Sequence, residues 1–129
     1  MNNNCIKPHE ILYRGISINP IVWNQDTNRP SSAAFKQSNS LSVDREGGRS
    51  RKDIFDSLRK NVKNTLKAIA WISAKQCFER NMKVRPDPME INQYHALIDD
   101  NDSRIGVGKT NARFLARKCE FELLPIDKH

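Results

Sequence analysis

The sequence predicts a single α+β domain over residues 1–129, with two helices packed on a small mixed or antiparallel sheet. Three observations lead to this fold class. The chain of 129 residues has the usual length of one domain. Several short apolar stretches bounded by turn residues indicate strands, and two segments with apolar residues at helical spacing indicate helices. A two-layer arrangement is the simplest way to bury the apolar faces of both kinds of element.

The expected strands are short. The first covers residues 11–16 and the second covers 21–23, before a turn-rich connection at 24–30. The remaining strands are expected at 41–44, 69–74, 82–85, 94–98 and 121–124. Residues 99–102 contain three aspartates and an asparagine, which indicates an acidic turn.

The strongest helical signal covers residues 51–67. Ser50 and Asp53 have the spacing of an N-terminal capping box. Apolar residues then recur at helical spacing, at Ile54, Phe55, Leu58, Val62, Leu66 and Ile69. A second helix is expected at 110–118, and a short helical turn at 75–81.

The composition restricts the class of protein. No run of about 18 apolar residues and no N-terminal apolar segment is present, so we expect neither a membrane span nor a signal peptide. Cys5, Cys77 and Cys119 are an odd number of widely spaced cysteines without a CxxC pair, which indicates free thiols in a reducing cytoplasm. We expect no metal and no cofactor.

Positive charge is concentrated in the middle of the chain. The net charge is +7, and residues 45–85 hold twelve basic and four acidic side chains. Such an excess favours polyanionic partners. The leading hypothesis is therefore a small basic accessory protein that binds nucleic acid or an acidic partner protein. The candidate contact residues on the 51–67 helix are Arg51, Lys52, Arg59, Lys60, Lys63 and Lys67. The same charges would also suit a helix face that is simply solvated.

A glycine loop precedes the second expected helix. Residues 103–110 nearly match the phosphate-loop pattern GxxxxGK[ST], with serine in place of the first glycine. Only 19 residues follow Thr110, which is too few for the sheet of such an NTPase. The start of the helix could still bind an anion, with Lys109 and Thr110 as candidate residues; otherwise the loop only leads into a capped helix.

A small enzyme is the alternative to a binding module. Tyr13-Arg14-Gly15 on the first strand, followed by Ser31-Ser32, resembles the start of ADP-ribosyltransferase folds, including the RES-type toxins that consume NAD. The resemblance implies that Arg14 would grip the NAD phosphates. No obvious catalytic glutamate accompanies it. The candidate catalytic residues are Arg14, Ser31, Ser32, Asp44 and His95. A structural subunit of a larger complex is a third possibility.

Several short motifs occur along the chain in a recognisable order. Residues 29–36 read RPSSAAFK and residues 41–44 read LSVD. Later come Asp87-Pro88, HALI at 95–98 and Gly108-Lys109. This pattern resembles a family of small uncharacterised bacterial proteins, and the resemblance implies a bacterial origin but no mechanism. It marks a possible polar cluster of Arg29, Ser31, Ser32, Asp44, His95 and Lys109. Such a cluster would be either a site or a network that holds loops to the sheet.

Overall fold

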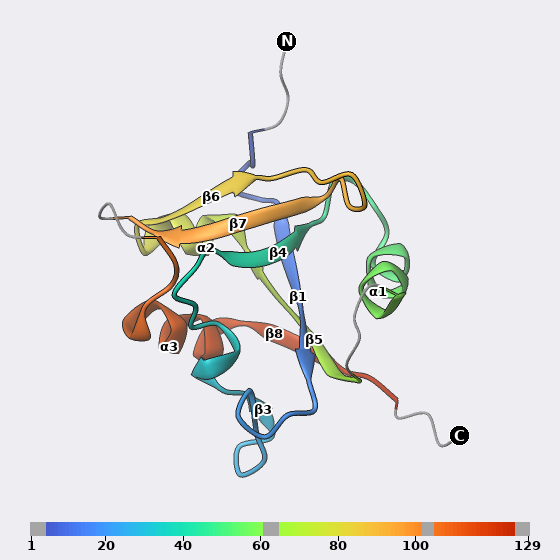
Figure 1. Cartoon of the computed structure of the whole chain (residues 1–129), viewed down its shortest axis with the longest axis vertical. Coiled ribbons are helices and arrows are strands. Elements are labelled where there is room, and N and C mark those ends of the chain that lie inside the picture. Colours follow the sequence, from blue (N-terminus) through green and yellow to red (C-terminus); the bar gives the residue numbers. More distant parts are fainter. Residues whose placement is uncertain (1–4, 61–64, 102–104, 126–129) are drawn as a thin grey trace.

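Six antiparallel strands form the main sheet, in the order β6-β7-β4-β1-β5-β8 (Figure 1). The computed structural model describes residues 5–60, 65–101 and 105–125. The six strands are β1 (Ile11–Ser17), β4 (Leu41–Arg45), β5 (Leu66–Ser73), β6 (Met82–Pro86), β7 (His95–Asp100) and β8 (Glu120–Leu123). Strands β2 (Trp23–Asn24) and β3 (Arg29–Pro30) pair as a separate hairpin.

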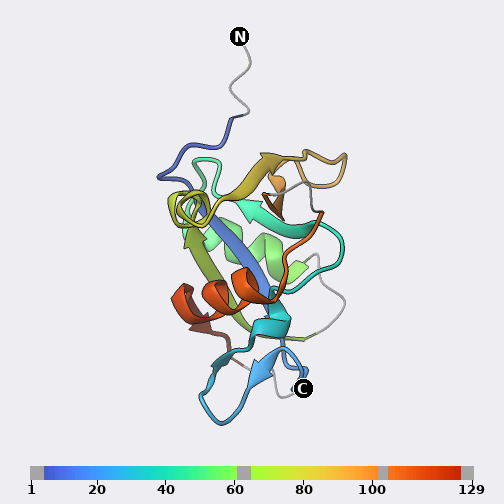
Figure 2. The same cartoon turned by 90° about the vertical axis from the view of Figure 1, so that its left-hand side faces the viewer.

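The described residues contain three α-helices, namely α1 (Arg51–Lys60), α2 (Ala74–Glu79) and α3 (Lys109–Lys118), and the 3-10 turn η1 (Ser32–Ala34). Helix α3 and η1 cover one face of the sheet, and α1 covers the other (Figures 1 and 2). The predicted α+β class and its antiparallel alternative are therefore confirmed, with one helix more than the two expected. The expected two-layer arrangement is wrong, because helices cover both faces of the sheet and make three layers. No described helix has the length and apolar character needed to span a membrane.

Each face of the sheet has its own core. Leu12, Leu41 and Ile98 pack with Leu115 of α3 on one face. Tyr13, Ile69 and the α1 residues Ile54 and Phe55 form the core of the other face. Strand β1 serves both cores because its successive side chains point to opposite faces.

The predicted helix at 51–67 is wrong at its C-terminal end. Ser50 does accept a hydrogen bond from the Asp53 N–H, as the capping pattern predicts, but α1 ends at Lys60 and residues 61–64 lie outside the described part. Leu66 and Lys67 belong to β5, where Leu66 pairs with Ser17 of β1. Because β5 is buried on both faces, its continuous apolar run resembles a continuation of the helical stripe.

The predicted acidic turn at 99–102 is also wrong in its first half. Asp99 and Asp100 extend β7 and pair with Lys83 and Met82 of β6. Asp102 lies outside the described residues. The side chains fit a strand because backbone N–H groups of the following glycine loop donate hydrogen bonds to both carboxylates.

The other elements follow the sequence closely. Strands are confirmed at 11–16, 41–44, 82–85 and 94–98, each within one or two residues, and 121–124 overlaps β8. The short helical turn at 75–81 is α2, which begins with a capping box formed by Ser73 and Gln76. Of the expected strand at 21–23, only Trp23 pairs, because the two preceding residues lie in a turn.

Two buried carboxylates hold distant segments together. Arg45 donates two hydrogen bonds of 2.9 Å to Glu10, one to each carboxylate oxygen. Burial raises the pKa of Glu10, but the hydrogen bonds from Arg45 and Gly47 outweigh it, so the pKa lies below its ordinary value. Burial likewise raises the pKa of Asp99, and hydrogen bonds from Ser40 and Gly106 bring it below its ordinary value.

Candidate functional site

The polar residues marked by the sequence do not form one cluster. Arg29 lies on β3 and donates from Nη2 to the carbonyl oxygens of Ala116, Arg117 and Cys119, at 2.9, 3.2 and 3.1 Å. It therefore satisfies carbonyls at the C-terminal end of α3. Ser31 Oγ donates to the carbonyl of Ile21 at 2.6 Å, which fixes the chain ahead of the β2–β3 hairpin, and Ser32 begins η1.

Arg14 also binds backbone. Its Nε donates to the carbonyl of Ala34 and its Nη1 to the carbonyl of Ser42, both at 2.8 Å. Burial lowers the pKa of Arg14 to about 10, which still leaves the guanidinium charged at neutral pH. Arg14, Arg29 and Ser31 thus behave as the network that holds loops to the sheet, rather than as a site.

Asp44 and His95, in contrast, lie at one open cleft. His95 of β7 pairs with Asp44 of β4, and Asp44 pairs with Tyr13 of β1, so the three share one face of the sheet. Beyond Tyr13 the strands β1 and β4 no longer pair. We call the hollow above this gap the β1–β4 cleft. It has a volume of about 270 Å³ and is lined by Tyr13, Arg14, Gly15, Ser42, Val43, Asp44, Leu58, Met89, Ile91, Asn92 and His95.

Neighbouring side chains orient both polar residues of the cleft. Asn92 Nδ2 donates to Asp44 Oδ1 at 3.0 Å, and Arg49 Nη2 lies 3.7 Å from Asp44 Oδ2. His95 Nδ1 lies 3.0 Å from Asp87 Oδ2 and 3.2 Å from the Asp87 carbonyl oxygen. Because both of these oxygens only accept, Nδ1 carries a proton, and Nε2 is an acceptor whenever the imidazole is neutral.

Acidic side chains are interspersed among the basic residues of α1. Lys52 is paired with Asp56 at 2.9 Å, and their hydrogen bond raises the pKa of Lys52. The Arg51 guanidinium lies 4.4 Å from the ring centroid of Trp71. Arg59 and Lys60 are exposed at the end of α1.

Of the other two candidates of the stripe predicted at 51–67, only Lys67 is among the described residues, and it is not on α1. Lys63 lies outside the described residues. Lys67 is on β5, with its Nζ 5.6 Å from the ring centroid of Trp23. The six basic residues therefore do not form the single helical stripe that the sequence predicts.

Helix α3 carries a cleaner basic surface, which the sequence reasoning missed. Lys109, Arg113 and Arg117 recur every four residues and are exposed, as is Lys118. We call Lys109, Arg113 and Arg117 the α3 basic stripe; Lys118 lies about 100° further round the helix. One helical step of four residues advances about 6 Å along the axis. No acidic residue lies between Lys109 and Lys118, and this absence was the signal available in the sequence.

The acids that follow α3 point away from the stripe. Glu120 and Glu122 of β8 pair with Trp71 and Ile69 of β5. Residues paired across strands share a face, and Ile69 and Trp71 pack on the α1 side. Glu120 and Glu122 therefore lie on the opposite side of the sheet from α3, which is seen in front in Figure 2.

The glycine loop before α3 already binds a carboxylate of the protein, that of Asp100 on β7. Gly108 N donates to Asp100 Oδ2 and Asn111 Nδ2 donates to Asp100 Oδ1, both at 2.9 Å. The carboxylate of Asp100 thus occupies the place at the helix start where an external phosphate would bind. Lys109 and Thr110 remain exposed beside it, so Lys109 can contribute to the stripe.

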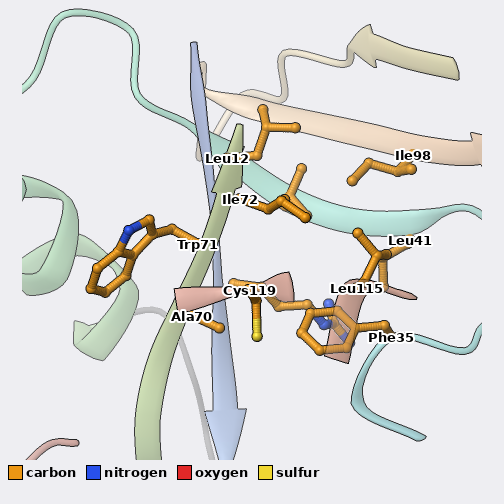
Figure 3. A pocket seen from close by; sticks show the side chains of 11 residues that line it. Leu12, Phe35, Leu41, Ala70, Trp71, Ile72, Ile98, Leu115 and Cys119 are labelled. Carbon is orange, nitrogen blue, oxygen red and sulfur yellow. The ribbon is translucent and has the colours of Figure 1, made fainter. Parts of the chain in front are cut away.

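A second cavity is too small for a ligand. It lies inside the α3-side core and is enclosed by apolar side chains that include Leu12, Phe35, Leu41, Ile72, Ile98 and Leu115 (Figure 3). Its volume of about 10 Å³ is at most that of one water. Among the described residues, no three His, Cys, Asp or Glu side chains are grouped to hold a metal ion.

Comparison with protein-family models, with curated proteins and with solved structures found no match for this chain. The α3 basic stripe and the β1–β4 cleft are therefore the two features from which a function can be inferred.

Proposed function

We propose that the protein binds nucleic acid through the α3 basic stripe, as a small accessory protein of the bacterial cytoplasm. The observation that carries this proposal is the regular row of exposed cations on α3 without an interspersed acid. Cations about 6 Å apart on a rigid helix can each neutralise a phosphate and release its counterions. The contacts involve phosphates alone, so binding is independent of base sequence.

The helix that carries the stripe is held firmly. Its inner face buries Ala112, Leu115 and Ala116, and Arg29 satisfies the carbonyls at its C-terminal end. The backbone positions of the cations are therefore set before any ligand arrives. Such preorganisation lowers the entropic cost of binding.

The chemistry of this face favours a polyphosphate over an acidic protein. Stable protein interfaces are centred on apolar or aromatic side chains. On the outer face of α3 the exposed side chains are polar or charged, and the half-buried ring of Phe114 is covered by the Arg80 guanidinium at 4.8 Å. An acidic protein partner is the alternative that the experiment below separates.

The test is fluorescence anisotropy with a labelled 20-base-pair DNA duplex at 50 and 200 mM salt. Three phosphate contacts predict a slope of about −2.7 in log affinity against log salt, or about a 40-fold loss across this range. The triple variant K109Q/R113Q/R117Q should lose most of this dependence. The matched control K52Q/R59Q/K60Q removes three cations from α1 and should retain most of the binding.

Two outcomes would overturn the proposal. One is equal binding by wild type and the α3 variant. The other is negligible DNA binding at 50 mM salt together with stripe-dependent binding of polyglutamate, which would favour the acidic protein partner.

The NAD-consuming alternative has weaker support. It needs the Arg14 guanidinium to face NAD phosphates, but Arg14 donates to two backbone carbonyls and is largely enclosed. Ser31 is likewise bound to backbone, and it lies away from the β1–β4 cleft. Convergence of Asp44 and His95 alone does not supply the phosphate-binding group that this reaction needs.

A further inference from the structure

We propose that the β1–β4 cleft binds a small molecule with a planar apolar body and an amidine or amino group that donates hydrogen bonds. This site is separate from nucleic-acid binding, since the cleft lies on the α1 side of the sheet and the basic stripe lies on the opposite side. Its volume of about 270 Å³ is close to the lower end of the range for ligand pockets, about 300–1,000 Å³.

The polar end of the cleft offers acceptors. The Asp44 carboxylate uses one lone pair for Asn92, and Arg49 at 3.7 Å is too distant for a second hydrogen bond. A carboxylate has about four acceptor sites, so further donors can be received. His95 adds Nε2 as an acceptor, because Asp87 holds the proton on Nδ1.

The cations near the cleft are not available to an anionic ligand. Arg14 donates to the carbonyls of Ala34 and Ser42. Arg49 donates to the carbonyls of Arg45 and Glu46, and its guanidinium lies 3.7 Å from the ring centroid of Tyr94. The side chains of Asp44 and His95 keep exposed fractions of 9% and 16%. With the donors engaged and these acceptors partly exposed, the cleft favours ligands that bring donors.

Apolar side chains form the other walls. Leu58 of α1 is half-buried, and Met89 and Ile91 in the β6–β7 connection are 45% and 83% exposed. A flat apolar body placed between α1 and this connection would cover these side chains. That burial supplies affinity, while the acceptors of Asp44 and His95 determine orientation.

The experiment uses three probes of similar shape: benzamidine, benzamide and benzoate. Each is titrated into ¹⁵N-labelled protein and followed by NMR. Benzamidine should shift signals of Asp44, Asn92 and His95, and should bind at least tenfold more tightly than benzoate, with benzamide between them. Benzoate binding as tightly as benzamidine, or benzamidine shifts confined to other parts of the chain, would overturn the proposal.

Two variants locate the interaction. Asp44→Asn should weaken benzamidine at least tenfold and benzamide much less, because it removes the charge while keeping an acceptor. Since this change could disturb the contacts with Asn92 and Arg49, Ile91→Ser provides a second test at an exposed position and should weaken all bound probes about threefold. The matched control Ile21→Ser alters an exposed isoleucine outside the cleft and should leave binding unchanged. Unchanged binding in Ile91→Ser would contradict the proposed apolar wall.

Discussion

Arg29 is expected to be one of the main determinants of stability, although it lies on a two-residue strand. The variant Arg29→Met keeps much of the apolar stem but removes every donor. Three carbonyl oxygens at the end of α3 then lose their charged partner. The Phe121 ring, whose centroid lies 5.1 Å from the guanidinium carbon, loses a cation–π contact as well.

The size of the effect follows from these contacts. Nη2 carries two hydrogens, so the three carbonyls share the equivalent of two hydrogen bonds. A hydrogen bond from a charged donor contributes about 1.5–3 kcal/mol, and the lower value applies because the carbonyls are partly accessible to water. The cation–π contact adds about 0.5 kcal/mol. The expected loss in free energy of unfolding is therefore about 3.5 kcal/mol.

Urea denaturation followed by circular dichroism measures this loss. With a slope of about 2 kcal/mol/M, the midpoint should fall by about 1.8 M. Arg113→Met is the matched control, since Arg113 is an exposed cation on the same helix, and its effect should stay within about 0.5 kcal/mol. Equal midpoints for Arg29→Met and Arg113→Met would refute the assignment of Arg29 as the cap of α3.

Two further predictions concern the carboxylates and the glycine loop. Glu10 and Asp99 have pKa values in the folded protein that lie below their ordinary values. Their ionised forms therefore stabilise the fold fully at pH values above the unfolded-state pKa of about 4. This stabilisation is lost as the pH falls through the lower pKa values of the folded state. The urea midpoint should therefore be lower at pH 3 than at pH 7, and the difference should shrink in Glu10→Gln; an equal difference in the variant would exclude Glu10 as a source. Gly106 has φ +96°, and an added Cβ would lie 2.2 Å from the carbonyl oxygen of Gln37, so Gly106→Ala should cost about 3 kcal/mol or more. The control Gly48→Ala has φ +77° and open space around the added Cβ, so it should cost only about 1 kcal/mol. Thermal unfolding measures both variants. Equal losses of stability in the two would show that the close approach to Gln37 is unimportant.

Much of the fold could be predicted because local patterns coincide with local structure. The alternation at 41–44 and the capping residues before α1 each place an element correctly. The end of α1 could not be found in the same way. Leu66 and Ile69 continue the helical spacing, and no glycine or proline separates them from α1. Their place in a strand is decided by pairing with β1, about 50 residues earlier in the chain.

The candidate site was predicted only in part for a related reason. Asp44 and His95 meet because β4 and β7 are neighbours, which no local pattern encodes. Arg14 stands in a short apolar segment and Arg29 in a polar, turn-rich one, and the carbonyl partners of both on other elements could not be identified from the sequence. The α3 basic stripe needed no long-range information, because the spacing of its cations and the absence of acids between them are both visible in the sequence.

The position of β1 has a consequence for how the chain folds. This strand comes first in the sequence, yet it lies between β4 and β5, so both of its neighbours are made later. On a ribosome, β1 would remain without either neighbour until residues 41–45 and then 66–73 have emerged. Pairing over such separations raises the contact order and slows folding. Acquisition of structure should therefore begin within the later β6–β7 pair, whose strands are close in sequence, and end when β1 is enclosed.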